Sequence, residues 1–175
     1  MSESFTVKKK RGEQFVDFVI SRIQIDNAFR AALSRSDNPA TEYQAWEYLA
    51  HWCDLGKEWE RRPIATIAAA VAVEKPLKDG YSGIGKAIAS CYDDRDQAKT
   101  KFRRLLACDS VNETCKILRP LLRLIALKAK KTLSYGKLLN ELLYFGDGEK
   151  IKVQWANDFY GRRNNDSDYS EIDQK

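Results

Sequence analysis

The chain has 175 residues, a net charge of +5 and a hydrophobic content of 43%, which is enough to bury a core in one domain or in two small lobes. Its longest apolar run is ten residues, from Ile64 to Val73, whereas a membrane-spanning helix needs about 18 to 20. The N-terminal stretch "MSESFTVKKKRGEQF" carries charges without an apolar segment behind them, so we do not expect a secretion signal. We therefore expect a cytoplasmic protein with no membrane partner.

The first half of the chain predicts four helices. Apolar residues recur at helical intervals in "GEQFVDFVISRIQ", and Asp26 can start a second helix, "NAFRAALSR", that ends before Pro39. Thr41 is a candidate cap for a third helix, "EYQAWEYLAHWCDL", which Gly56 closes. Pro63 fits the first turn of an alanine-rich fourth helix. The loop "EKPLKDGYSG" follows it.

The second half predicts short helices at "IGKAIASCY" and "RDQAKTKFRRLLAC". Ser110 and Glu113 form a capping-box pattern that opens a long helix to about Leu127. Ser134 can cap "YGKLLNELLYF", and a last helix, "EKIKVQWANDFY", ends before Gly161. Eight or nine helices without a convincing strand predict an all-α helical bundle in two small lobes. We divide the chain into a basic N-terminal arm (1–11), an N-terminal helical lobe (12–92), a C-terminal helical lobe with a basic face (93–162) and an acidic disordered tail (163–175).

The stretch "GYSGIGKA" has its outer glycines and Lys86 at the spacing of a phosphate-binding loop. Such a loop needs a hydroxyl residue after the lysine, where this chain has Ala87, and a buried strand before the first glycine, where it has the charged, proline-containing "VEKPLKD". We therefore predict a tight turn into a helix, with Ile84 and Ile88 packed inward and Lys86 facing out.

Cysteine and histidine usage gives no metal or catalytic motif. None of the four cysteines forms a C-x-x-C pair, and His51 is the one histidine, so we expect reduced, buried thiols and no zinc or other cofactor. His51 lies in "YLAHWCDL" without a nucleophile motif, which favours a ring packed on a helix face over a catalytic base.

Positive charge is concentrated in residues 99–137, where eleven Lys or Arg residues accompany two acidic ones. That segment is therefore +9, and the total of +5 leaves −4 for the rest of the chain. So few acidic residues leave most of these bases without an intramolecular partner. The imbalance indicates a polyanionic partner.

Helical geometry sorts these bases onto outward faces. In the long helix, Lys116, Arg119, Arg123 and Lys130 fall within an arc of about 60°, opposite an apolar face. Pro120 removes one backbone hydrogen bond from this helix and should kink it.

A second group of bases borders the apolar face of "AKTKFRRLLAC", with Lys99 and Arg103 on one flank and Lys101 and Arg104 on the other. Arginine favours phosphate because its guanidinium group binds two oxygens at once. No recognition helix or stacking sheet is evident, so we predict binding to the nucleic-acid backbone without sequence preference.

The order of "DNAFRAALSRSDNP", "GIGKAIA", "KFRRLLACDS", "LRPLLRLI", "LSYGKLLNELLYF" and "VQWANDFY" resembles the CasB family, the small subunit of the type I-E CRISPR surveillance complex, Cascade. The likeness covers most of residues 26–160, and its most specific part runs from "GIGKAIA" to "WANDFY".

The resemblance implies a non-catalytic, two-lobed helical subunit, present as two copies stacked head to tail in a crRNA-guided antiviral complex. Its implied partners are crRNA, the target and displaced DNA strands, and other Cascade subunits, and its implied role is to stabilise the R-loop through basic side chains. The nucleic-acid-binding residues that the resemblance suggests are Arg30, Arg35, Lys86, Arg103, Arg104, Arg119 and Arg123.

Three alternatives remain open from the residues. The basic face could dock on an acidic protein, in an assembly protein without nucleic acid. An enzyme could use "GYSGIGKA" with a nucleotide. The third is a free-standing helix-turn-helix regulator, although this chain shows no helix pair in which a short glycine turn precedes a basic second helix.

Overall fold

The structure is a computed structural model that describes residues 8–130, 132–146 and 148–161. Its helices are α1 (Arg11–Ile23), α2 (Asn27–Leu33), α3 (Trp46–Leu49), α4 (Glu58–Glu74), α5 (Ile84–Cys91), α6 (Arg95–Leu106), α7 (Val111–Lys128), α8 (Tyr135–Leu143) and α9 (Glu149–Tyr160), with a 3₁₀ helix η1 (Glu42–Ala45) before α3. Within these residues the only β pairing is an isolated bridge between Ser82 and Leu133. The predicted all-α fold is confirmed.

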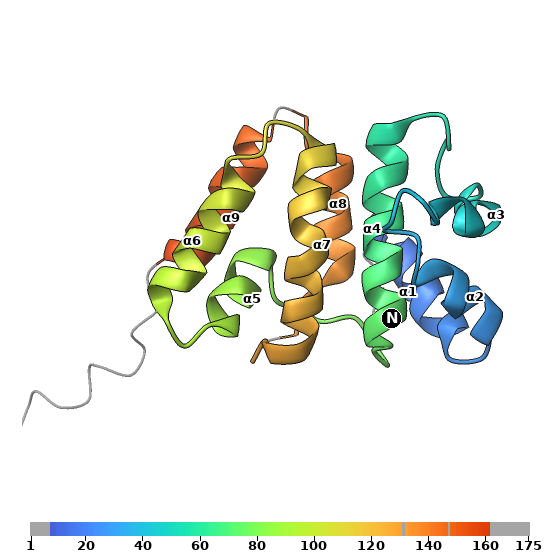
Figure 1. Ribbon diagram of the computed structural model, residues 1–175, viewed down its shortest axis with the longest axis horizontal. Coiled ribbons are helices and arrows are strands. Elements are labelled where there is room, and N and C mark those ends of the chain that lie inside the picture. The colour runs from blue at the N-terminus through green and yellow to red at the C-terminus, as the bar shows by residue number, and fades with distance from the viewer. Residues whose placement is uncertain (1–7, 131, 147, 162–175) are drawn as a thin grey trace, which may run out of the picture.

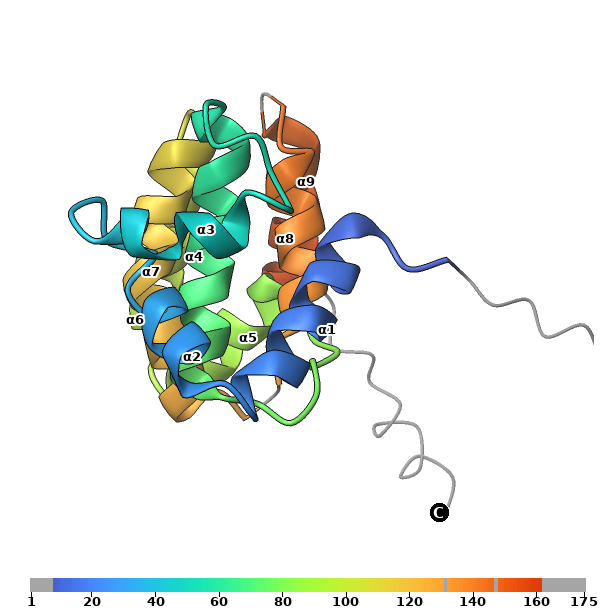
Figure 2. The ribbon, with the colours of Figure 1, turned by 90° about the vertical axis from the view of Figure 1, so that its right-hand side faces the viewer.

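The helices form two layers that share one core. Figures 1 and 2 show α6 and α7 on one side of the molecule, with α8 and α9 behind them. Helix α4 packs on α7, α8 and α1, while α5 contacts α6, α7 and α9. Buried side chains run without interruption from Phe15 in α1 to Phe159 in α9. The division into two lobes at residue 92 stays a prediction.

Polar caps begin several helices as the sequence predicts. The Asp26 carboxylate accepts a hydrogen bond from the amide of Phe29, and the Ser134 hydroxyl accepts one from Lys137. Ser110 likewise accepts from the Glu113 amide at 3.2 Å. The Glu113 carboxylate reaches one residue further back than a capping box requires, to the amide of Asp109.

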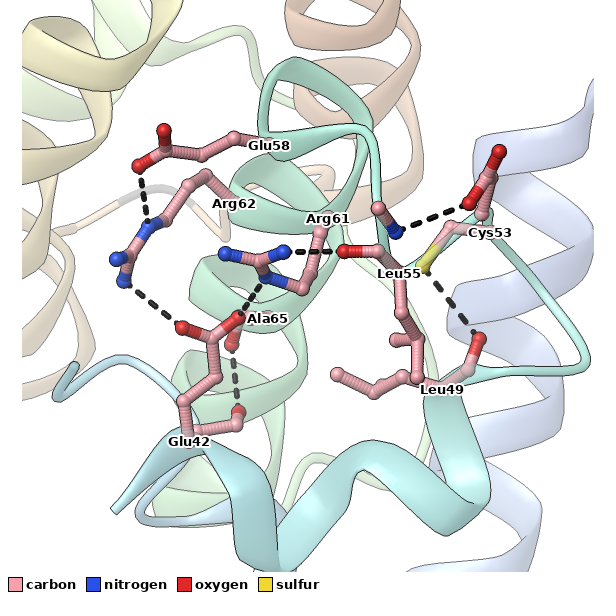
Figure 3. A network of polar contacts seen from close by, with 11 residues as sticks. Glu42, Leu49, Cys53, Leu55, Glu58, Arg61, Arg62 and Ala65 are labelled. Carbon is pink, nitrogen blue, oxygen red and sulfur yellow. Dashed lines mark hydrogen bonds and ion pairs between the residues drawn. The ribbon is translucent and has the colours of Figure 1, made fainter. Parts of the chain in front are cut away.

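The predicted third helix is wrong. Residues 42–55 form the short η1 and α3 and then a turn, instead of one helix. The first residue of this segment, Glu42, is 2% exposed and pairs with Arg61 at 2.8 Å and Arg62 at 2.9 Å (Figure 3). After Leu49 the chain turns, and the carbonyl oxygens of Trp52 and Leu55 accept hydrogen bonds from Arg11 and Arg61 instead of from a continuing helix.

Helix α4 begins a turn earlier than predicted. It starts at Glu58, so Pro63 lies in its second turn instead of its first. Helix α7 continues through Pro120 without a break, at the position where we expected a kink.

The predicted acidic tail lies outside the described residues. Among those that are described, no helix is long and apolar enough to cross a membrane.

Candidate nucleic-acid interface

Helix α6 carries four of the predicted binding residues on a rigid support. Its inner face buries Ala98, Phe102 and Leu105, and the Phe102 ring stacks on Phe159 of α9 at 4.2 Å between centroids. The charged residues of α6 therefore point away from the core. They are Lys99, Lys101, Arg103 and Arg104.

Three of these four α6 side chains are exposed, namely Lys101, Arg103 and Arg104. In the part of the chain that the structure describes, none of the three has an ion-pair partner. Lys99 is half-buried, and its ammonium group lies 3.9 Å from the carboxylate of Asp96, one turn earlier. A pair this long at the surface contributes little to stability, about 0 to 1 kcal/mol.

Helix α7 separates core and basic residues as predicted. Leu118, Leu122 and Ile125 are buried, and Lys116 is exposed on the opposite side without an ion pair among the described residues. Arg119 and Arg123 differ from Lys116, because both pair with the carboxylate of Asp37, at 3.1 Å and 3.3 Å. Arg119 and Arg123 are therefore among the bases of residues 99–137 that do have an intramolecular partner.

Lys130 does not continue the basic face of α7. The helix ends at Lys128, and Ala129 has extended backbone angles (φ −65°, ψ 132°). The predicted position of Lys130 within the helical arc is wrong for this reason. Its ammonium group lies 4.0 Å from Asp93, beside the start of α6.

The remaining predicted residues are spread over other elements. Arg30 of α2 is half-buried and donates from Nε to the carbonyl oxygen of Ala72 at 3.0 Å, near the end of α4. Arg35 is exposed in the turn after α2 and donates to Gln44 at 3.4 Å. Lys86 is exposed on α5. None of the three lies on α6 or α7 itself, although Arg35 shares its turn with Asp37, the ion-pair partner of Arg119 and Arg123.

The glycine loop is a packing feature. Ile84 and Ile88 are buried and Lys86 is exposed, as predicted. A side chain on Gly85 would lie 2.9 Å from the amide nitrogen of Phe159 and closer still to the carbonyl oxygen of Trp155, so only glycine lets α5 approach α9.

The carboxylate of Asp79, which precedes Gly80, connects this loop to the start of α8. It accepts hydrogen bonds from Gly80 at 2.9 Å, from Tyr135 at 2.8 Å and from Gly136 at 2.9 Å. The last two of these amides are the first two of α8, so Asp79 caps that helix and joins it to the loop.

Three of the four cysteines are buried, namely Cys53, Cys108 and Cys115, while Cys91 is half-buried, and all are free thiols. Burial raises the pKa of Cys115 to about 12, which keeps it protonated and unreactive. The described residues contain no group of three or more His, Cys, Asp and Glu side chains that could hold a metal ion.

The predicted packing of His51 is wrong, because this residue is exposed in the turn after α3. It lines an open pocket of about 530 Å³ together with Phe18, Tyr48 and Trp52. Arg22 also lines this pocket, with its guanidinium group 5.2 Å from the Tyr48 ring centroid and 3.2 Å from Asp26. None of the predicted binding residues lines this pocket.

The sequence analysis missed Asp37, the acid that orders the α7 arginines. It lies 86 residues from Arg123 along the chain, so no local pattern connects them. The available signal was weak, since Asp37 is the one acid between Asp26 and Glu42, in the basic segment "RAALSRSDNP".

Comparison with known proteins gives this helical arrangement a family. Residues 29–160 match the family model described as CRISPR-associated protein Cse2. The chain belongs to the Cse2 family. Three solved structures carry the names Cse2 or CasB and share the fold, so the predicted CasB resemblance is confirmed. No curated protein matched the chain.

The Cse2 fold extends over nearly all of the described helices. TTHB189, a CRISPR-associated Cse2-family protein from Thermus thermophilus, is 24% identical with a TM-score of 0.69, over 86% of this chain and 98% of that one. A structure named CasB, also from Thermus thermophilus, is 23% identical with a TM-score of 0.66 over the same shares of the two chains. M. ruber CasB is 25% identical with a TM-score of 0.67, over 87% of this chain and 94% of that one.

Proposed function

We propose that this Cse2-family protein is a non-catalytic small subunit of a crRNA-guided antiviral complex, Cascade, and that it binds nucleic-acid backbone through α6 and α7. The observation that best supports this proposal is that seven basic side chains on two neighbouring helices have only two acidic partners in the described structure. These seven are Lys99, Lys101, Arg103, Arg104, Lys116, Arg119 and Arg123.

Backbone binding follows from the chemistry of this surface. Four of the seven side chains have no ion pair within the described residues, and four arginines supply planar donor groups that suit phosphate oxygens. About five phosphate contacts on a single strand correspond to a slope of log K against log salt of roughly −3.5.

In the complex, these contacts would stabilise the target strand and the displaced strand of the R-loop, whose formation is a nearly balanced exchange of duplexes. The partners we propose are crRNA, target DNA, other Cascade subunits and a second copy of this chain stacked head to tail. The two-lobe organisation and a cytoplasmic location belong to the same proposal. Membership of the Cse2 family supports it.

The test compares double variants in which two basic residues are replaced by neutral glutamine. Their binding to fluorescent single-stranded oligonucleotides is measured over a range of salt concentrations. Arg103→Gln with Arg104→Gln removes two exposed side chains that have no ion pair among the described residues. We expect weaker binding by a similar factor for every oligonucleotide sequence, and a salt slope reduced in magnitude by about 1 to 2.

The matched control is Lys78→Gln with Lys150→Gln, which removes the same charge from exposed positions outside α6 and α7. A loss that depends on oligonucleotide sequence would contradict backbone binding. An equal loss in the control variant would show that total charge, and not this surface, determines the affinity.

A second candidate function is docking of the same face on an acidic protein. The observation in its favour is the pairing of Arg119 and Arg123 with a carboxylate in this fold. Under this alternative, the association of the protein with its partner would survive nuclease treatment, and the purified assembly would contain no nucleic acid.

A further inference from the structure

One carboxylate oxygen of Asp37 serves both arginines of α7. Arg119 forms an ion pair with Oδ2, with Nε at 3.1 Å, and Arg123 donates a hydrogen bond to it from Nη2 at 3.3 Å. The Asp37 side chain is 7% exposed, whereas those of Arg119 and Arg123 are 38% and 51% exposed. The acid therefore lies beneath two guanidinium groups that remain open to solvent.

The turn that carries Asp37 is fixed on both sides. The hydroxyl of Ser36, fully buried, lies 2.7 Å from the carbonyl oxygens of Leu33 and of Ala65 in α4. The Thr41 hydroxyl donates to the carbonyl oxygen of Arg35 at 2.8 Å. An anion that approaches from solvent would join this arrangement and leave Asp37 in position, because displacing the carboxylate would require the anchored turn to move.

Each arginine keeps most of its donors. Arg119 faces the carboxylate with Nε and keeps both Nη groups for another acceptor, while Arg123 uses Nη2 and retains Nε and Nη1. The other carboxylate oxygen of Asp37, Oδ1, is buried and has no hydrogen bond in the described structure. Asp37 is among the residues that line a crevice of about 10 Å³ between α4 and α7. Among the described residues, the carboxylate of Asp37 forms ion pairs with Arg119 and Arg123 of α7.

From this geometry we infer that the turn after α2 and the outer face of α7 form a phosphate-binding site, in which Asp37 is a built-in counter-ion. Asp37 orients both guanidinium groups and cancels one of their two charges, so the site binds phosphate more weakly than two free arginines would. This inference rests on the proposed function, because that function supplies nucleic-acid phosphate as the biological ligand. It adds that Asp37 lowers the affinity of this surface for phosphate.

The size of the effect follows from Coulomb's law. A phosphate on the outer side of the arginines would lie about 7 Å from the carboxylate, and with an effective dielectric constant of about 40 to 80 the repulsion corresponds to roughly a 3- to 8-fold change in affinity. The two guanidinium groups would lose some orientation without Asp37, which opposes the gain but is the smaller effect for side chains that are already half-exposed.

The experiment uses Asp37→Asn, which keeps the shape of the side chain and removes its charge. Asp17→Asn on α1 is the control, because it removes the same charge from an acid that pairs with Lys9 instead of α7. Binding of inorganic pyrophosphate is followed by the NMR signals of the arginine Nε–H groups, and binding of a labelled oligothymidine by anisotropy.

We expect Asp37→Asn to bind both probes about 3- to 8-fold more tightly than the wild type, with a salt slope up to about one larger in magnitude. Asp17→Asn should bind them like the wild type. Equal or weaker binding by a folded Asp37→Asn variant would overturn the inference.

A measurement on the wild type covers the case in which the variant does not fold. The hydrogen bond from Arg123 Nη2 to Asp37 should persist when pyrophosphate is added, as the NMR signals of the Arg123 guanidinium group would show, because Asp37 remains in position. Loss of this bond on binding would overturn the inference. If the wild type binds pyrophosphate as described but binds no oligonucleotide, the proposed function fails and the inference stands.

Discussion

The close approach of α5 to α9 predicts that Gly85→Ala destabilises the protein. A Cβ atom at this position would lie 2.9 Å from the amide nitrogen of Phe159 and 3.0 Å from Cβ of Asp158, whereas ordinary contact starts at 3.4 Å. The nearest atoms belong to the α9 backbone, which cannot rotate away as a side chain can. The two helices must therefore separate by at least about 0.5 Å, and such overpacking costs about 1 to 3 kcal/mol.

The higher helix propensity of alanine offsets part of this loss of stability. Alanine is favoured over glycine in helices by up to about 1 kcal/mol. The expected net loss in the free energy of unfolding is about 1 to 2 kcal/mol, which corresponds to a decrease in Tm of roughly 2 to 8 °C for a chain of this size.

Urea denaturation followed by circular dichroism measures this loss directly. The control is Gly56→Ala, where the nearest atom is a carboxylate oxygen of Asp54 at 3.2 Å, at the end of a side chain that can move. We expect little change in that variant. A Gly85→Ala protein as stable as the wild type would refute the view that this glycine is required for packing.

Two further changes follow from buried acids. Glu42→Gln removes the charge that two α4 arginines share (Figure 3), so we expect the free energy of unfolding, measured by urea denaturation, to fall by about 3 kcal/mol. The control is Glu58→Gln at an exposed position, where we expect a loss of less than about 1 kcal/mol. Equal losses in the two variants would contradict this reasoning. Burial raises the pKa of Glu141 above its ordinary value of 4.5, so the folded state binds more protons than the unfolded state and stability falls as pH rises from 4.5 through the raised pKa. Glu141→Gln keeps an acceptor for Trp155 and should flatten that fall, as urea denaturation at several pH values would show; an unchanged pH dependence would argue against a raised pKa.

The positions of most helices could be predicted from the sequence because the relevant interactions are local. Asp26, Ser110 and Ser134 cap helices within three residues of themselves, and the side of α7 that is buried follows from the helical period. The concentration of basic residues in α6 and α7 is likewise a property of the sequence. It was enough to predict which helices present charge to solvent.

The tertiary structure determined the features that depend on residues far apart in the chain. The expected third helix stops at Leu49, where the carbonyl oxygens of Trp52 and Leu55 accept hydrogen bonds from Arg11 and Arg61, and Gly85 is required by the backbone of α9. The two arginines of α7 meet Asp37 across 86 residues in the case of Arg123. A burial or an ion pair of this kind has no local period or spacing, since it arises only when packing brings the distant segments together. The sequence therefore determined where the positive charge lies, and the fold determined how much of that charge is already balanced.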